Sequence, residues 1–122
     1  MAKTVLLIED EPNIIEAVQY ILSRDGWQAK THANGHDANA VIKTSLPDLI
    51  ILDVMLPGKS GYDILREIRL TPECLEIPVL MLTARGQTKD RQMAEALGAS
   101  RFMTKPFSNQ EMLDAVRELA GA

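Results

Sequence analysis

Short apolar segments alternate with amphipathic segments along the whole chain, and this alternation restricts the possible folds more than any other feature. The clearest apolar segment is Leu49–Leu52, where four aliphatic residues run straight into Asp53 and a turn that contains Pro57 and Gly58. A continuous apolar run of this length is typical of a strand that is buried on both faces. Four other segments are predicted strands, the second of them only weakly alternating: Val5–Ile8, Trp27–His32, Val79–Thr83 and Arg101–Thr104.

The intervening segments have the spacing of amphipathic helices. Their expected starts lie near five positions: Pro12, Ala38, Ser60, Thr88 and Ser108. Proline suits the first helical turn because its missing N–H would be unpaired there in any case. Ser108 with Glu111 forms a capping box for the last helix, and Ser60 with Asp63 is a variant of the same motif. Gly26 is a natural stop for the first helix.

This order of strands and helices predicts an α/β fold. Strands separated by helices of this length cannot form hairpins, so they pair in parallel through right-handed crossovers. We therefore expect a five-stranded parallel, doubly wound sheet with helices on both faces. No boundary or linker interrupts the pattern, so residues 1–122 are expected to form a single domain.

Composition and charge exclude several classes of protein. No apolar stretch reaches the roughly 18 residues that a transmembrane helix needs, so no membrane partner is expected. The net charge of −4 argues against nucleic acid as a direct partner. Cys74 is the single cysteine, and the start of the chain has no secretory cleavage pattern. Both features are typical of a cytoplasmic protein.

Polar side chains gather where the predicted strands end. Five residues end or follow strands in this way: Glu9, Asp10, Asp53, Thr83 and Lys105. In a doubly wound sheet the carboxyl ends of the strands meet at one edge, and ligands bind there. Each residue alone is also consistent with a solvated strand end, a helix cap or a surface cation. Their complementary chemistry as a set favours a functional site.

Three of these residues are carboxylates: Glu9, Asp10 and Asp53. Two like charges about 4 Å apart near a protein surface repel by roughly 4 kcal/mol, so such a group either takes up a proton or binds a cation. All the ligand atoms are oxygens, with no histidine or cysteine nearby in the pattern. The expected ion is therefore Mg²⁺, with Mn²⁺ as the alternative, rather than zinc.

Asp53 has the best position for a nucleophile, because its apolar strand holds it in the middle of the set. A carboxylate beside a metal ion can attack phosphorus and form an aspartyl phosphate. The Lys105 ammonium and the Thr83 hydroxyl can then neutralise oxygens of the phosphoryl group. The sequence thus predicts phosphoryl acceptance at Asp53.

The sequence as a whole resembles the receiver domain of two-component response regulators. Four motifs carry the resemblance: "LLIEDE", "DLIILDVMLPGKSG", "VLMLTA" and "MTKPF". Each motif is weak alone, but the four in order, at the ends of successive strands, are highly specific. The resemblance implies the flavodoxin-like strand order 2-1-3-4-5.

The resemblance also implies a role for each acid. Asp53 would accept a phosphoryl group from a histidine kinase or a phosphotransfer protein. Glu9, Asp10 and Asp53 would hold Mg²⁺ together with the backbone carbonyl of Met55. Glu9 is longer than the aspartate that many relatives carry, which is consistent with a metal contact through water.

The remaining site residues would contact the phosphoryl group and couple phosphorylation to a change in structure. Thr83 would contact the group, Lys105 would pair with it, and the peptide bond before Pro106 would be cis. The family carries an aromatic switch three residues before the lysine, here Phe102. Movement of Thr83 would let Phe102 turn inward and change the face of the fourth helix, fifth strand and fifth helix. Plain core packing of Phe102 is an open alternative.

The sequence looks most like receivers of winged-helix transcription factors, which pair through that same face. Arg91 and Glu111 are compatible with a salt bridge across such a weak homodimer. Ser100 and Arg101, however, stand where that subfamily usually has two acids. The downstream partner would be either a separate protein or an output domain that this sequence lacks.

Three other functions share part of the pattern. A phosphatase of the haloacid dehalogenase kind has a second acid two residues after its nucleophile, where this chain has Met55. A flavodoxin-like electron carrier needs a phosphate loop rich in Gly, Ser or Thr, where this chain has "EDEPN". A pseudo-receiver, an interaction module that is never phosphorylated, is the third. The favoured reading is a signalling switch with slow self-dephosphorylation, not a metabolic enzyme.

Overall fold

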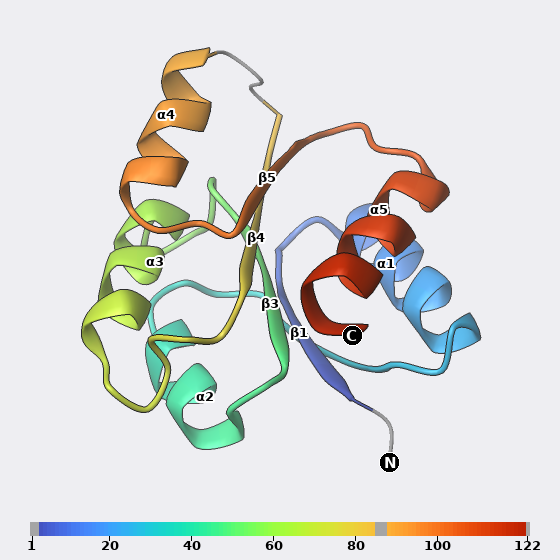
Figure 1. Cartoon of the computed structure of the whole chain (residues 1–122), viewed down its shortest axis with the longest axis horizontal. Helices are drawn as coiled ribbons and strands as arrows, with labels where there is room; N and C mark the ends of the chain where they lie inside the picture. Colours follow the sequence, from blue (N-terminus) through green and yellow to red (C-terminus); the bar gives the residue numbers. More distant parts are fainter. Residues whose placement is uncertain (1–2, 85–87, 122) are drawn as a thin grey trace.

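The computed structural model describes residues 3–84 and 88–121, which form a five-stranded sheet flanked by helices (Figure 1). The elements follow one another in this order: β1 Thr4–Ile8, α1 Pro12–Arg24, β2 Gln28–His32, α2 Ala38–Ser45, β3 Leu49–Asp53, α3 Gly61–Leu70, β4 Val79–Thr83, α4 Thr88–Ala96, β5 Arg101–Thr104, α5 Asn109–Val116 and a π-helical turn Arg117–Gly121. The strand order is β2-β1-β3-β4-β5, and all four pairings are parallel. The predicted α/β class and strand order are confirmed.

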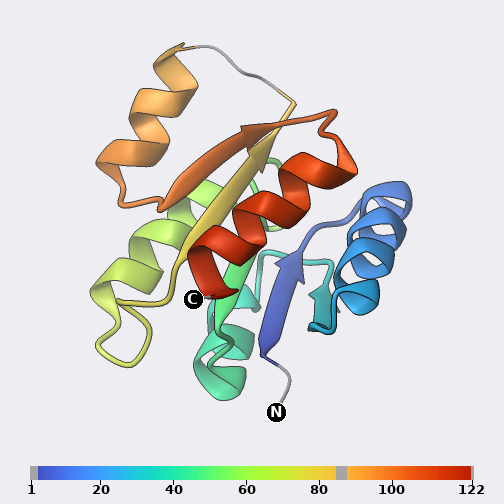
Figure 2. The same cartoon turned by 45° about the vertical axis from the view of Figure 1, so that its right-hand side comes forward.

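Helices cover both faces of the sheet, and each face has its own core. Figures 1 and 2 show α1 and α5 on one face and α2, α3 and α4 on the other. In β3, Ile51 packs with Val18 and Val116 on the α1/α5 face, whereas Leu52 packs with Ile64 on the opposite face. The uninterrupted apolar run in β3 is therefore required by burial on both sides.

The N-terminus of α3 departs from the predicted capping motif. The Ser60 hydroxyl accepts a hydrogen bond from the Tyr62 N–H at 3.1 Å, as an N-cap residue does. Asp63 does not complete a capping box; its carboxylate lies 3.4 Å from Arg66 instead. Aspartate is one methylene shorter than glutamate, so it reaches back to the cap less readily. The capping box of α5, between Ser108 and Glu111, is confirmed.

Several element boundaries also differ from expectation by a residue, and two of them affect the surrounding structure. β2 starts at Gln28, one residue late, and the indole N–H of Trp27 donates to Asp25 at 2.9 Å. The regular part of α5 ends at Val116, and the chain continues as the π-helical turn. Among the residues that the structure describes, no helix is both long enough and apolar enough to cross a bilayer.

Candidate functional site

The five polar residues singled out in the sequence meet at the carboxyl edge of the sheet. Glu9 and Asp10 follow β1, Asp53 ends β3, Thr83 ends β4, and Lys105 follows β5. Three of their side chains are buried, because Glu9 is 0%, Thr83 2% and Asp53 3% exposed. Asp10 is exposed. A residue at a solvated strand end is exposed. The interpretation as mere solvated strand ends is therefore excluded for Glu9 and Asp53, whose carboxyl groups are buried.

Lys105 lies among three carboxylates. Its Nζ is 2.7 Å from Oε1 of Glu9, 3.2 Å from Oε1 of Glu11 and 3.3 Å from Oδ1 of Asp53. The side chain is 10% exposed. Burial works against the charge of Lys105, but contact with Glu9 and the negative charges of Asp53 and Glu9 raise its pKa. The lysine therefore stays protonated and offsets part of the negative charge of the site.

Glu9 is a fully buried acid whose pKa is raised. Burial raises the pKa of Glu9 from 4.5 to about 7; Lys105 works against this rise, and nearby Asp53 adds to it. Oε2 accepts the backbone N–H of Asp10 at 3.1 Å. No hydrogen-bond donor of the described residues reaches Oε1 at a suitable angle, so its contact with Lys105 is ionic. A buried carboxylate oxygen without a hydrogen bond is ready to accept a further ligand.

The acids fit a divalent metal ion. Glu9, Asp10 and Asp53 each offer one carboxylate oxygen, and these atoms all lie within 4.8 Å of one another. The donor set consists of oxygen atoms only, which suits a hard cation such as Mg²⁺. Met55 lies beside them with an exposed side chain, and its backbone N–H donates to Asp53 at 3.3 Å.

A close approach of two backbone segments positions the loop that follows Asp53. The N–H of Gly61 donates to the Val54 carbonyl at 2.9 Å, which folds the loop back onto the end of β3. A Cβ atom at Gly61 would collide with the Asp53 carbonyl oxygen and stand 2.9 Å from Val54 Cα. Gly58 turns the same loop with φ +85°, a conformation that suits glycine. Backbone sterics therefore explain why the motif after Asp53 has glycine at Gly58 and Gly61.

Thr83 and Lys105, which both lie at the site, are also linked by a backbone hydrogen bond. The N–H of Lys105 donates to the Thr83 carbonyl at 2.7 Å. Within the same pair of strands, Thr83 is the register partner of Thr104. The Lys105–Pro106 peptide bond is cis, as the family resemblance implies.

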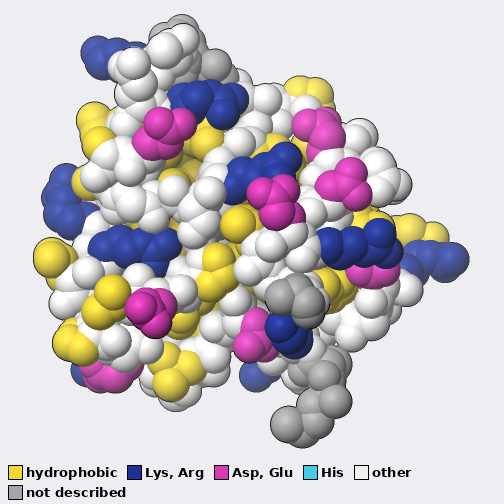
Figure 3. Space-filling view, in the orientation of Figure 1, with side chains coloured by type: hydrophobic (Ala, Val, Ile, Leu, Met, Phe, Trp, Pro, Cys, Tyr) yellow, Lys and Arg dark blue, Asp and Glu magenta, His cyan; other side chains and the backbone are white. Residues whose placement is uncertain are grey.

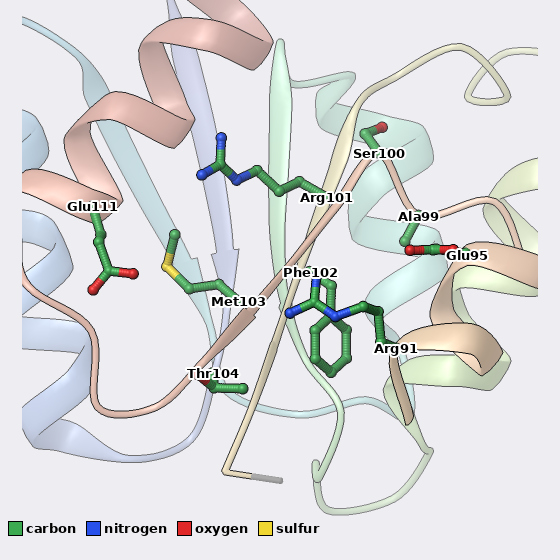
Figure 4. A pocket seen from close by; sticks show the side chains of 9 residues that line it. All are labelled: Arg91, Glu95, Ala99, Ser100, Arg101, Phe102, Met103, Thr104 and Glu111. Carbon is green, nitrogen blue, oxygen red and sulfur yellow. The ribbon is translucent and has the colours of Figure 1, made fainter. Parts of the chain in front are cut away.

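Phe102 lies in β5 on the side of α4. It is 7% exposed and belongs to the core on the α2/α3/α4 face. The Arg91 guanidinium stands 5.2 Å from the centre of its ring (Figure 4). Figure 4 shows Arg91 on α4 and Glu111 on α5 on opposite sides of β5.

Glu11 is the site residue that sequence reasoning missed. It is the third of three consecutive acids, and the sequence placed it only at the end of the first strand. In the structure it occupies the N-cap position of α1 without capping the helix by its side chain. Its carboxylate turns to Lys105 instead, 94 positions away in the chain. A glutamate at a position that favours Ser, Thr, Asp or Asn was the available signal.

Comparison with known proteins adds an independent finding. A family model described as the response regulator receiver domain matches residues 5–117. The phosphate regulon transcriptional regulatory protein PhoB of Rhizobium meliloti (strain 1021) is 37% identical over 119 residues, covering 98% of this chain and 52% of that protein. The chain spans about half the length of the curated relatives it matches.

Solved structures resemble this fold closely. Chemotaxis protein CheY4 of Vibrio cholerae has a TM-score of 0.90 at 28% identity and is covered to 99%, with 98% of this chain matched. The receiver domain of sensor histidine kinase PA1611 from Pseudomonas aeruginosa PAO1 has a TM-score of 0.90 at 27% identity, with 100% of both chains covered. That structure was solved with a magnesium ion coordinated in the active site cleft.

Proposed function

The chain belongs to the response regulator receiver domain family, and we propose that it is a phosphorylation-activated signalling switch whose acceptor is Asp53. Receiver domains belong to two-component systems and are generally switches rather than metabolic enzymes. The observation that carries the proposal is the Asp53 carboxylate, 3% exposed at the end of β3 and 3.3 Å from the ammonium of Lys105. A buried carboxylate paired with a fixed cation is prepared to receive an anionic group.

The reaction transfers a phosphoryl group from a phosphohistidine of a histidine kinase or phosphotransfer protein. An Asp53 carboxylate oxygen attacks phosphorus and forms an acyl phosphate, the P–N bond breaks, and its electron pair returns to the imidazole of the donor. Lys105 pairs with one phosphoryl oxygen, and the Thr83 hydroxyl donates to another. Slow hydrolysis of the acyl phosphate by water returns the switch to its resting state.

The same site would hold Mg²⁺, or Mn²⁺ in its place. The ligands would be carboxylate oxygens of Glu9, Asp10 and Asp53, with the backbone carbonyl of Met55. The cluster of three oxygens and the Glu9 oxygen without a hydrogen bond support this assignment. When bound, the ion would neutralise charge on the phosphoryl oxygens.

We propose that phosphorylation changes the face formed by α4, β5 and α5, and that this face controls a partner. Thr83 and Phe102 would couple the phosphoryl group to that face. A second copy of the chain would pair there, with Arg91 of one copy opposite Glu111 of the other. The final target would be a downstream protein or an output domain such as the additional half of the curated relatives.

Residues 1–122 are proposed to act as one receiver domain in the cytoplasm, where the buried free thiol of Cys74 would stay reduced. The proposal includes no direct contact with nucleic acid or membrane. On the face seen in Figure 3, acidic and basic side chains lie next to one another. A mixed surface with net charge −4 supports a protein partner rather than a polyanion.

The test is the intact mass of the protein after incubation with acetyl phosphate and Mg²⁺. We expect one added phosphoryl group on the native chain and none on Asp53→Asn or after chelation of Mg²⁺. A mutant that is still labelled once would remove Asp53 as the acceptor. If the native chain also stays unlabelled with a panel of histidine kinases, the pseudo-receiver interpretation replaces this one.

The variant Lys105→Ala should separate acceptance of the phosphoryl group from the change in structure that follows it. The variant keeps Asp53, so we expect labelling to persist at a reduced rate while the response of the α4/β5/α5 face is lost. Amide chemical shifts of α4 and β5 before and after phosphorylation measure that response. Unaltered shift changes in the variant would show that Lys105 does not transmit the signal.

A further inference from the structure

The β3–α3 loop, residues 54–60, is held from outside by the neighbouring helix α2. The loop directly follows the proposed acceptor Asp53 and contains Met55, whose backbone carbonyl is a proposed ligand of the metal ion. At the far end of the loop, the Ser60 hydroxyl caps α3. A free loop of this length has many conformations, so contacts from elsewhere in the chain are needed to keep the single conformation that a metal site requires.

Lys59 reaches from this loop to both neighbouring helices. Its Nζ donates to Oδ1 of Asn39 in α2 at 3.0 Å and forms an ion pair with Glu67 of α3. The side chain is 25% exposed, although lysine is usually a surface residue. The ammonium therefore has a carboxylate and an amide oxygen as fixed partners, and much of the stem is shielded from water.

Asn39 uses both groups of its amide. Oδ1 accepts from Lys59, while Nδ2 donates to the backbone carbonyl of Ile64 in α3 at 3.2 Å. Because the amide carries its donor and its acceptor on opposite sides, the bond to Ile64 fixes which group faces Lys59. The helices α2 and α3 lie side by side on this face of the sheet (Figures 1 and 2). The amide thus ties the loop to both helices at once.

The segment between β2 and α2 supports the same loop through its backbone. The N–H of Gly35 donates to the Pro57 carbonyl at 2.9 Å. A Cβ atom at Gly35 would collide with the carbonyl oxygen of Lys59, so the two segments touch directly. A Cβ atom at Gly58 would stand 2.9 Å from Oδ1 of Asn34. The start of α2 and the segment before it therefore form one wall against which the β3–α3 loop rests.

We propose that Asn39 and Lys59 are positioning residues of the phosphoryl-acceptor site. Through their bond to each other and their contacts with α3, they keep the β3–α3 loop in the conformation that presents the Met55 carbonyl to the metal ion. Neither side chain contacts the ion or the phosphoryl group in this role. The inference rests on the proposed function, which supplies the ion. It adds a residue of α2, a helix that provides none of the polar side chains at the carboxyl edge of the sheet.

The contact should act on ion affinity rather than on the reaction of the loaded site. A loop that samples other conformations must be ordered each time the ion binds, so the apparent affinity falls by the fraction of time that the loop is correctly placed. Once the ion is bound, the loop is ordered and Asp53 reacts as in the native chain. This distinction separates a positioning role from a general loss of stability.

Three variants test the role. Lys59→Met keeps an unbranched stem without the ammonium, and Asn39→Leu keeps a similar volume without the amide. Lys43→Met is the matched control, because Lys43 also lies on α2 and pairs with Glu73 at 3.4 Å, outside the β3–α3 loop. Urea unfolding of each variant confirms that the chain is folded under the conditions of the measurements below.

The first readout is a Mg²⁺ titration of the unphosphorylated chain, followed by the amide chemical shifts of residues 53–61. We expect the dissociation constant to rise about tenfold in Lys59→Met and in Asn39→Leu, the smaller of the losses typical when groups that hold metal ligands in place are removed. Lys43→Met should bind Mg²⁺ at least as tightly as the native chain. Loss of a positive charge by itself favours binding of a cation, so weaker binding by Lys59→Met must come from the loop. Native affinity in both loop variants would overturn the inference.

Labelling by acetyl phosphate gives the kinetic counterpart. Both loop variants should need about tenfold more Mg²⁺ for half-maximal labelling, while the maximal rate at saturating Mg²⁺ stays native. A lower maximal rate with an unchanged Mg²⁺ requirement would overturn the positioning role, because it would place the effect on the reaction instead of on the loop.

Hydrogen exchange of the metal-free chain tests the contact independently of the proposed function. The N–H groups of Gly35 and Gly61 are both hydrogen-bonded at the loop and should exchange faster in Lys59→Met and Asn39→Leu, but not in Lys43→Met. Faster exchange together with native Mg²⁺ binding would overturn the positioning role alone. A native chain that neither binds Mg²⁺ nor is labelled would overturn the proposed function and this role with it.

Discussion

Glu9 is a charged residue type in a fully buried position. Burial raises its pKa from 4.5 to about 7, with Lys105 opposing the rise and Asp53 adding to it. A carboxyl group with a raised pKa in the folded state binds its proton more tightly there than in the unfolded chain. Its contribution to stability is therefore complete below about pH 4.5 and is lost as the pH rises to about 7.

This leads to a prediction for Glu9→Gln, which resembles the protonated acid at every pH. In metal-free buffer the variant should gain stability relative to the native chain as the pH rises from 4.5 to 7, and the difference should level off above that range. Urea unfolding at a series of pH values measures this difference. A constant difference across the range would mean that Glu9 titrates in the folded protein as it does in water.

Glu11 acts on the same lysine from the rim of the site, with its side chain 59% exposed and Oε1 3.2 Å from Lys105 Nζ. The contact helps to raise the pKa of Lys105. Glu11→Gln should therefore lower that pKa, which NMR titration of the Nζ group measures directly. Glu16→Gln, an exposed acid of α1 that forms no ion pair in the described structure, is the matched control and should leave the titration unchanged.

At the scale of elements, the start of α5 depends on its capping box. The Ser108 hydroxyl accepts the N–H of Glu111 at 3.0 Å, and the Glu111 side chain accepts the N–H of Ser108. Ser108→Ala should reduce the free energy of unfolding by about 1 kcal/mol, whereas Ser108→Asn should keep most of it. Denaturant unfolding distinguishes the two. An unchanged free energy of unfolding in Ser108→Ala would show that the hydroxyl contact contributes nothing.

The conformation of the loop between β3 and α3 requires that Gly61 has no Cβ atom. Gly61→Ala would push a Cβ into the Asp53 carbonyl, so we expect a loss of about 1–3 kcal/mol and slower labelling by acetyl phosphate. Gly26→Ala is the contrasting variant, because Gly26 has φ +87° but nothing within 4 Å of an added Cβ. It should lose stability through backbone strain alone and label at the native rate. Native labelling by Gly61→Ala would show that the loop yields without moving Asp53.

For the whole molecule, the proposed metal site should be linked to global stability. The acids lie after β1 and at the end of β3, so an ion that binds only the folded chain must stabilise it. At ten times its dissociation constant, Mg²⁺ should add about 1.4 kcal/mol to the free energy of unfolding. Asp10→Asn removes one exposed carboxylate of the proposed site and should abolish most of this gain. A thermal midpoint that is the same in Mg²⁺ and in chelator would argue against the site.

Much of the fold could be predicted because its signals are local. The buried run Leu49–Leu52, Pro12 at the start of α1 and the Ser108 capping box each act through neighbours in the chain. Where such signals are weak, the prediction was less accurate. Asp63 did not complete its capping box, and α5 ends in a π-helical turn that no sequence pattern had indicated.

Local sequence patterns were sufficient to predict the order of strands and helices. Because parallel strands end on the same side of a sheet, that order also places five residues at one edge: Glu9, Asp10, Asp53, Thr83 and Lys105. How these groups interact could be seen only in the folded molecule. Burial of Glu9, the turn of Glu11 toward Lys105 and the stacking of Arg91 on Phe102 join residues far apart in the chain. Such contacts depend on side-chain packing and on water exclusion, which arise only when all the layers of the fold are assembled.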